Sequence, residues 1–294
     1  IGNIPSSYDT AISLSEFTGE IEYEPGDMTV VANAGVTIGY LNSLLAQEGQ
    51  RLAFEVRNPE QATVGGSVAS NAPGRRQSST GGIRDWVIGM QIVLADGTVT
   101  KTGGRVVKNV QGYEMHRLHT GAYGTLGVVS QAAFKLLPIP PEQQTVIAWF
   151  DDASIATEVG IKLVNGLFLP EAISVISGPL AKQTVEASGE SINTDEVTAL
   201  LIKLGGGVRS IERQVNEVVG AVGAAAAAGY AVLNEISEKS AWAKLEDAES
   251  SSILTVRMTS RPLATLEASK TARTNISNIH SREISTISDL GFGA

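Results

Sequence analysis

The first 140 residues alternate short apolar runs with turn signals, which predicts a β-rich region with one short helix. The segment from Thr37 to Gln47 places Ile38, Leu41 and Leu44 at helical spacing, and Thr37 can cap it. An Asp-Gly pair after residue 95 predicts a hairpin turn between two β-type runs. The predicted strands of this region cover residues 28–34, 87–94, 99–102 and 127–137.

A proline cluster at residues 138–141 ends this region, and strand-like and helix-like segments then alternate. The predicted strands cover residues 144–150, 172–176, 198–204 and 253–258, and the predicted helices cover residues 152–163, 210–228 and 262–277. We therefore predict two α+β domains, residues 1–140 and residues 141–294, the second being a sandwich with helices on one face. Neither end carries a typical starting or closing element, so we expect both domains to be truncated there.

Composition and charge exclude several classes of protein. Hydrophobic residues make up 43% of the 294 residues, enough for a substantial core, and the net charge of −9 disfavours a nucleic-acid binder. The absence of cysteine excludes disulfides, thiolate nucleophiles, iron–sulfur ligation and an S-linked flavin. No apolar run is long enough to predict a membrane-spanning helix.

Two segments of small residues are candidates for a cofactor or phosphate site. One runs from Ala62 to Gly74 and the other from Gly121 to Val129. Small residues leave backbone N–H groups accessible to a flat ring or a phosphate, and glycine can adopt the positive φ that aims them. Neither segment has the Gly-Lys-Ser/Thr of a P-loop or a G-x-G-x-x-G fingerprint. Most segments of this kind are simple turns, so spacing alone leaves both interpretations open.

Six blocks of sequence, taken together in this order, resemble those of a known protein family. They are Ala62-Thr63-Val64-Gly65-Gly66, Ala69-Ser70-Asn71-Ala72-Pro73-Gly74, Arg84-Asp85-Trp86-Val87-Ile88-Gly89, Ala95-Asp96-Gly97, Lys108-Asn109-Val110-Gln111-Gly112-Tyr113 and Gly124-Thr125-Leu126-Gly127-Val128-Val129. Together they resemble the FAD-linked oxidases of the vanillyl-alcohol-oxidase type, and the fifth block most resembles the FAD-binding subunit of bacterial glycolate oxidase. The resemblance covers about residues 14–140. It implies a PCMH-type FAD-binding domain followed by an α+β, ferredoxin-like cap domain.

The resemblance implies FAD as the cofactor and a site built on both glycine-rich segments. The isoalloxazine ring would lie along residues 62–66, with backbone N–H groups near N5 and the pyrimidine oxygens. The ribityl and pyrophosphate groups would follow residues 67–74, and residues 124–129 would meet the ribityl or adenine end. The implied cofactor-binding residues are Pro59, Ala62, Thr63, Gly65, Gly66, Ser67, Ala69, Ser70, Asn71, Gly74, Gly124, Gly127, Val128 and Val129. No catalytic base or metal ligand is assigned.

The implied activity is FAD-dependent oxidation of a small 2-hydroxy acid such as glycolate or D-lactate, by a subunit of a glycolate oxidase-like complex. The family's glycine-rich pyrophosphate loop and the His-x-His pair of related cap domains are not found in this sequence. The absence of the His-x-His pair favours an alternative of another class, a non-catalytic flavin-binding or scaffold subunit. A reductase of peptidoglycan precursors on a related fold is a weaker alternative. We expect other oxidase subunits as partners, no nucleic acid, and a cytoplasmic protein or one peripheral to the inner membrane.

The remaining polar candidates favour structural roles. His116 and His119 lack the further ligands that a zinc site needs, so packing or surface roles are preferred. His280 lies in a polar stretch and is expected to be solvated. Lys108 could hold an anionic substrate or form a structural ion pair. For the pair at residues 75–76, both arginines, and for Arg84, a solvated loop is preferred over contact with a substrate carboxylate or a partner.

Two further features also favour structural roles. The three tryptophans, Trp86, Trp149 and Trp242, are expected to pack rather than to line a substrate site. The run Gly205-Gly206-Gly207 lacks a following Lys-Ser/Thr, so a strand-to-helix turn is preferred over a phosphate loop.

Overall fold

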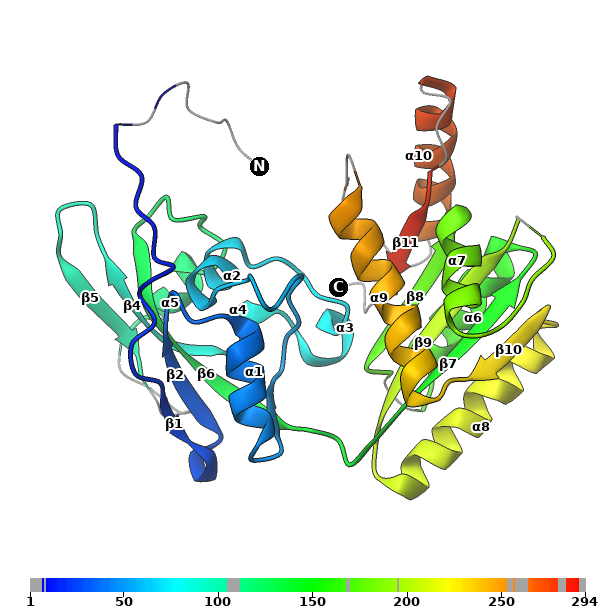
Figure 1. The fold of residues 1–294 in the computed structure, drawn as a ribbon, viewed down its shortest axis with the longest axis horizontal. Coiled ribbons are helices and arrows are strands. Elements are labelled where there is room, and N and C mark those ends of the chain that lie inside the picture. The colour runs from blue at the N-terminus through cyan, green and yellow to red at the C-terminus, as the bar shows by residue number, and fades with distance from the viewer. Residues whose placement is uncertain are drawn as a thin grey trace. The chain divides into compact units, whose positions relative to one another are not determined.

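The computed structural model describes residues 7, 9–104, 112–167, 170–194, 196–252, 256, 264–279 and 284–290. The predicted strand at residues 253–258 lies almost wholly outside this set, and the candidates Lys108 and His280 lie outside it. The chain forms two compact units, drawn in Figure 1. Residues 1–74 and 81–139 form the first unit, and residues 75–80 and 140–294 form the second. The predicted single boundary near residue 140 therefore does not account for residues 75–80, which belong to the second unit.

The first unit is built on a six-stranded antiparallel sheet with the order β1-β2-β6-β4-β5, and β3 also pairs with β6. The strands are β1 (Glu22–Glu24), β2 (Thr29–Asn33), β3 (Gln50–Leu52), β4 (Val87–Val93), β5 (Val99–Gly103) and β6 (Val128–Pro138). The four predicted strands correspond to β2, β4, β5 and β6. The long central strand β6 pairs with three neighbours because its apolar residues, including Phe134 and Leu136, are buried in the core of this unit.

Short helices complete the first unit. They are a 3-10 turn η1 (Pro25–Asp27), α1 (Ile38–Ala46), α2 (Val64–Ser70), α4 (Ile83–Trp86) and α5 (Met115–His119). Helix α1 was predicted, and the Oγ1 atom of Thr37 accepts the N–H of Tyr40 as its cap. Helix α2 was expected as a bare loop, but Val64 and Val68 are fully buried and fix it against β6 and β2. Tertiary packing thus outweighs the low helix propensity of its two glycines.

The second unit has a five-stranded antiparallel sheet with the order β10-β7-β9-β8-β11. The strands are β7 (Glu142–Phe150), β8 (Ala172–Ser177), β9 (Thr198–Gly206), β10 (Gly229–Val232) and β11 (Thr286–Asp289). Helix α6 connects β7 to β8 and helix α8 connects β9 to β10, so the first four strands follow the split βαβ plan of ferredoxin-like domains. The ferredoxin-like topology implied by the resemblance is therefore present.

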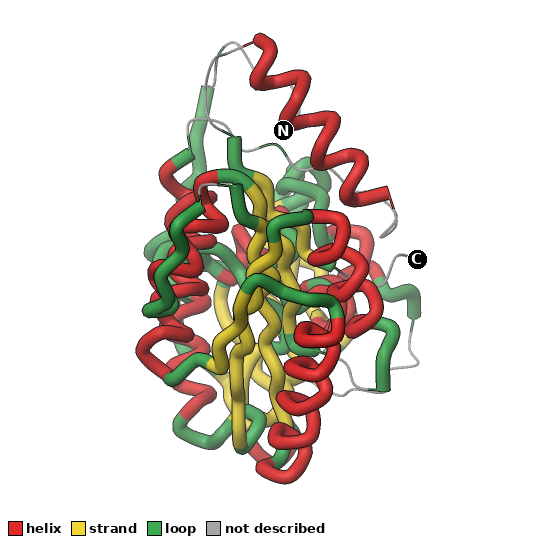
Figure 2. The backbone as a smooth tube through the Cα atoms, turned by 90° about the vertical axis from the view of Figure 1, so that its right-hand side faces the viewer, coloured by secondary structure: helices red, strands yellow, loops and turns green. Residues whose placement is uncertain are grey.

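Helices cover both faces of this sheet, as Figure 2 shows, so the expectation of helices on one face was wrong. Helices α6 (Ala153–Val164) and α8 (Val208–Ala224) pack on one face, and α7 (Pro179–Ala187) and α9 (Glu235–Ser251) pack on the other. The physical reason is that β8 is buried at every position, and such a strand needs cover on both sides. The unit also contains α3 (Gln77–Thr80) and α10 (Thr265–Ile279).

The tryptophans pack, as predicted. Trp149 is buried in the core between β7 and the α7–α9 face, and Trp242 packs there while its Nε1 donates to Thr145 Oγ1 at 3.1 Å. Trp86 packs against the core of the first unit with Lys135 Nζ 4.6 Å from its ring centroid. No helix among the described residues is long and apolar enough to cross a membrane.

Candidate cofactor-binding site

Helix α2 carries the first glycine-rich segment, and its ends are defined by two polar residues. Thr63 has an extended backbone, and its Oγ1 accepts the N–H of Gly66 at 3.2 Å as an N-terminal cap. Asn71 ends the helix in the left-handed conformation with φ of 46°. Its Oδ1 accepts the N–H of Arg84 at 3.3 Å, which ties the end of α2 to the start of α4. Asn71, one of the implied cofactor-binding residues, therefore makes a contact within the fold.

The first-turn N–H groups of α2 already have partners inside the first unit. The N–H of Val64 donates to Val36 O at 2.8 Å, and the N–H of Gly65 donates to Ala34 O at 2.9 Å. Glycine is needed at 65 because a Cβ there would lie 2.7 Å from the Cβ of Ala34. Residues 62–66 therefore do not present a row of accessible N–H groups, which corrects one part of the sequence-based expectation.

The outward face of α2 is built of small residues. We call it the α2 face; it consists of Ala62, Thr63, Gly66, Ala69 and Ser70, which are exposed or half-buried and lie on one side of the helix. At its border Ser67 is buried, and its Oγ has no hydrogen-bond partner. A buried hydroxyl without a partner is unusual and points to a group that would complete it.

The second glycine-rich segment lies directly beside α2. The N–H of Gly121 donates to Val68 O at 3.0 Å, and the N–H of Tyr123 donates to Ala69 O at 2.9 Å. These bonds satisfy carbonyl groups in the last turn of α2, which a helix end leaves without partners. Gly124 has φ of +73° and open space where a Cβ would lie. The fold thus brings both predicted segments to one place on the first unit.

Other residues of the implied set have contacts within the fold. Pro59 O accepts the N–H of Gly39 at 2.8 Å, and a Cβ at Gly74 would lie 2.6 Å from Glu55 O. The remaining three lie at the start of β6: a Cβ at Gly127, just before the strand, would lie 2.7 Å from Ile92 Cγ2, Val128 is half-buried, and Val129 is buried in the core. Within the implied set, Gly66 and Gly124 are exposed, and the other members are half-buried or buried.

Two buried histidines lie on α5, the helix that leads into the second segment. The side chains of His116 and His119 are only 5% and 8% exposed, and neither Nδ1 has a hydrogen-bond partner. Burial lowers the pKa of His116 below its usual value; Arg117 lowers it further, and Glu114 opposes the shift. The packing role predicted for this pair agrees with their burial. Among the described residues no group of three or more His, Asp or Glu side chains could hold a metal ion.

The interpretation of Arg75 and Arg76 as a solvated loop was wrong. Both side chains belong to the second unit and are largely buried, at 12% and 14% exposed. Arg75 forms ion pairs with Glu249 and Asp289, and Arg76 lies near Glu171. Sequence reasoning missed these pairs because the partners lie far away along the chain. In the Gly205–Gly207 run, Gly205 and Gly206 end β9 and Gly207 precedes α8, so the predicted strand-to-helix turn is confirmed.

The residues of the α2 face fit a planar cofactor with a polar edge. The side chains on this face are small, a Cβ at Gly124 would meet open space, and the Ser67 hydroxyl supplies a buried polar group without a partner. Sites for cofactors combine apolar surface with a few polar groups in this way. Thr63 and Ser70 add compact hydroxyls at the edge of the same surface.

The comparisons with known proteins agree with one another. Residues 3–103 match the family model described as an FAD binding domain. The chain is 26% identical over 219 residues to glycolate oxidase subunit GlcD of Bacillus subtilis, covering 74% of this chain and 46% of that protein. It is 37% identical over 123 residues to glycolate oxidase subunit GlcE of Escherichia coli, covering 42% and 35%.

A third relative is the D-lactate dehydrogenase of Archaeoglobus fulgidus, 30% identical over 190 residues, covering 64% of this chain and 42% of that protein. The chain spans less than half the length of each of these relatives. A solved structure of alkyldihydroxyacetonephosphate synthase shares the fold with a TM-score of 0.67 at 18% identity, covering 87% of this chain and 53% of that one. Residues 3–103 thus match an FAD binding domain, and the chain is similar to glycolate oxidase subunits and to D-lactate dehydrogenases.

Proposed function

We propose that the first unit binds FAD on the α2 face and that the whole protein oxidises a small 2-hydroxy acid such as glycolate or D-lactate. The match of residues 3–103 to an FAD binding domain carries this proposal. Relatives named as glycolate oxidase subunits and D-lactate dehydrogenases support the substrate class. Both named substrates are short acids with a hydroxyl group on the α-carbon.

The proposed role of the chain's own residues is to bind and orient. The bare surface at Gly66 and Ala69 would take a flat ring without a steric clash, and the Ser67 hydroxyl would gain the hydrogen-bond partner that it lacks. Tyr123 and Gly124 would border the bound group, because their segment is bonded to the end of α2. When bound, FAD supplies a two-electron acceptor for the hydride of the substrate α-carbon.

We further propose that the whole protein works as a subunit of an oxidase complex. Two relatives are named as different subunits of glycolate oxidase, and this chain matches both. A flavin-binding subunit without its own turnover is the second candidate. It is favoured by the match to two differently named subunits of glycolate oxidase.

The test is an absorption spectrum of the purified full-length protein without oxygen, before and after the addition of glycolate or D-lactate. L-lactate is the matched control for D-lactate, since the two differ only in the configuration at the α-carbon. Flavin bands that bleach with one of the two substrates and persist with L-lactate support oxidation by this protein. Bands that persist with every acid contradict turnover by the protein alone and favour the second candidate. A protein that binds no flavin contradicts both.

A further inference from the structure

A short segment immediately after the flavin-site residues belongs to the second unit. Gly74 is the last residue of the first stretch of unit one, and the hexapeptide from Arg75 to Thr80 is part of unit two. The chain then returns to the first unit at Gly81. Gly74, at the end of the first glycine-rich segment, is therefore joined covalently to Arg75, a residue of the second unit.

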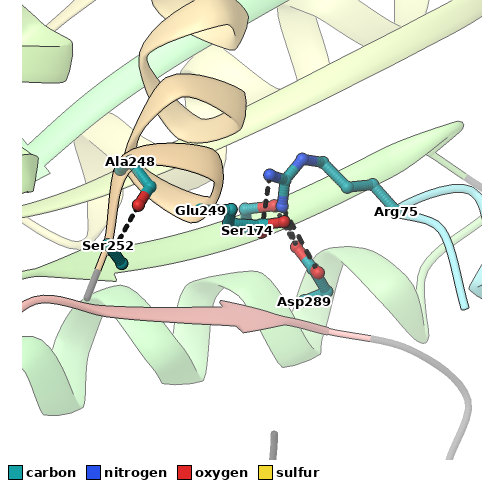
Figure 3. Close-up of polar contacts among 6 residues, drawn as sticks. All are labelled: Arg75, Ser174, Ala248, Glu249, Ser252 and Asp289. Carbon is teal, nitrogen blue, oxygen red and sulfur yellow. Dashed lines mark hydrogen bonds and ion pairs between the residues drawn. The ribbon is translucent and has the colours of Figure 1, made fainter. Parts of the chain in front are cut away.

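Arg75 is held by carboxylates from two different elements of the second unit, as Figure 3 shows. Its Nη2 lies 2.9 Å from Glu249 Oε1 in α9, and its Nη1 lies 3.3 Å from Asp289 Oδ1 in β11. Ser174 lies opposite Asp289 in the β8–β11 register and donates its hydroxyl to Oδ1 at 2.5 Å. Arg75 thus bridges a helix and a strand that are far apart in the sequence.

Burial makes this bridge different from a surface ion pair. The side chains of Arg75 and Glu249 are only 12% and 11% exposed, and that of Asp289 is 32% exposed. Exposed ion pairs contribute little because water and salt screen them, whereas removal of one partner from a buried pair is strongly unfavourable. Loss of the Arg75 guanidinium would leave two carboxylates without the cation that lies between them.

A second anchor holds the rest of the hexapeptide. Arg76 Nε lies 3.9 Å from Glu171 Oε2, and the Ser79 hydroxyl donates to Glu171 O at 2.8 Å. Gln143 Nε2 donates to the same Glu171 carboxylate at 2.8 Å. Gly205 leaves room for that carboxylate, since a Cβ there would lie 2.6 Å from Glu171 Oε1. The hexapeptide is therefore held to the rest of the second unit through polar contacts of Arg75, Arg76 and Ser79.

We propose that Arg75 is a positioning residue for the flavin site: by anchoring the chain one residue after Gly74, it restrains the stretch that runs from the end of α2 to Gly74. This inference rests on the proposed FAD function. Within the first unit, the contact of Asn71 with Arg84 and the close approach of Gly74 to Glu55 hold the two ends of residues 71–74. The Arg75 anchor would add a further restraint on residues 71–74 from the residue that directly follows them. Arg75 acts through them and does not itself touch the cofactor.

The experiment compares Arg75→Gln with Arg213→Gln in the full-length protein. Arg213 is the matched control, because its ion pair with Glu217 in α8 is exposed at 58% and 35%. Hydrogen exchange of the backbone amides of residues 69–74 is measured without added ligand, and the dissociation constant of FAD is measured by titration. In Arg75→Gln we expect faster exchange at these amides and roughly tenfold weaker FAD binding, within the usual range for coupling between sites. Arg213→Gln should match the wild type in both.

Arg75→Lys tests the role of charge and geometry. Lysine keeps the cation but cannot reach both carboxylates as a fork, so partial rescue of FAD affinity is expected. If Arg75→Gln does not fold, Arg75→Lys carries the same comparison with a smaller effect expected. Unchanged exchange at residues 69–74 and unchanged FAD affinity in the folded variant overturn the positioning role. A wild-type protein that binds no FAD overturns the proposed function instead, and the exchange data still decide whether Arg75 anchors this stretch.

Discussion

The backbone N–H of Tyr123 donates to the carbonyl oxygen of Ala69 at 2.9 Å and joins the two glycine-rich segments of the chain. Because Ala69 belongs to the α2 face, this bond places the second segment at its edge. The proposed site is therefore held together by backbone bonds between segments that are distant in sequence, and its surface is lined by small side chains. Substitutions that add bulk or remove the buried hydroxyl of Ser67 test this arrangement.

Gly65→Ala should destabilise the protein by about 1–3 kcal/mol, because the new methyl group would overpack against Ala34 in a close contact. The free energy of unfolding in urea measures the effect. Gly220→Ala is the matched control, since Gly220 lies on an exposed side of α8 with open space around it. There alanine should stabilise the protein by up to about 1 kcal/mol. Equal effects of the two substitutions would contradict the close packing of α2 on β2.

Ser67→Ala should weaken FAD binding while leaving the stability of the protein without cofactor unchanged or slightly higher. The reason is that the Ser67 hydroxyl is buried without a partner, so its removal costs no hydrogen bond within the protein. Ser43→Ala serves as the comparison, because the Ser43 hydroxyl donates to Gly39 O at 3.0 Å within α1. Because Ser43 is exposed inside α1 and alanine has the higher helix propensity, that substitution should change stability by about 0.5 kcal/mol or less and leave FAD binding unchanged. A loss of stability in Ser67→Ala with unchanged FAD affinity would assign Ser67 a purely structural role.

His116 should make the protein less stable as the pH falls. Burial lowers the pKa of His116 in the folded state, whereas the unfolded chain titrates near the ordinary value of 6.5. Below that pH the unfolded state binds more protons than the folded state, so stability is full above pH about 6.5 and is lost as the pH falls below it. His116→Leu should flatten the pH dependence of the unfolding free energy in this window, measured by urea titration at each pH. An unchanged slope would contradict a neutral, buried His116.

Local signals were sufficient to predict much of the first unit. The cap at Thr37 with apolar residues at helical spacing predicts α1, and the Asp96-Gly97 turn predicts the β4–β5 hairpin. Helix α2 was missed because two glycines disfavour a helix, and the bonds that fix it, such as that from Gly65 N–H to Ala34 O, come from another part of the chain. The Thr63 cap was the one local signal that could have indicated it.

Long-range contacts explain what the sequence could not predict. The bonds of Arg75 to Glu249 and Asp289 span 174 and 214 residues, so no local pattern distinguishes Arg75 from an arginine in a solvated loop. The helices on both faces of the second sheet, in contrast, could have been predicted from a local sequence pattern. The apolar run from Ala199 to Ile202 does not alternate with polar residues, which indicates a strand buried on both sides.

The most direct test of the central claim is the FAD content of purified Gly66→Leu, compared with Gly220→Leu and the wild type. Gly66 is exposed on the α2 face, and a Cβ there would lie 3.2 Å from Thr63 Oγ1, so leucine should leave the fold intact and cover the surface. We expect Gly66→Leu to keep the wild-type circular dichroism spectrum and lose the flavin absorption bands, while Gly220→Leu keeps both. Flavin bands of wild-type intensity in folded Gly66→Leu would contradict the placement of FAD on the α2 face.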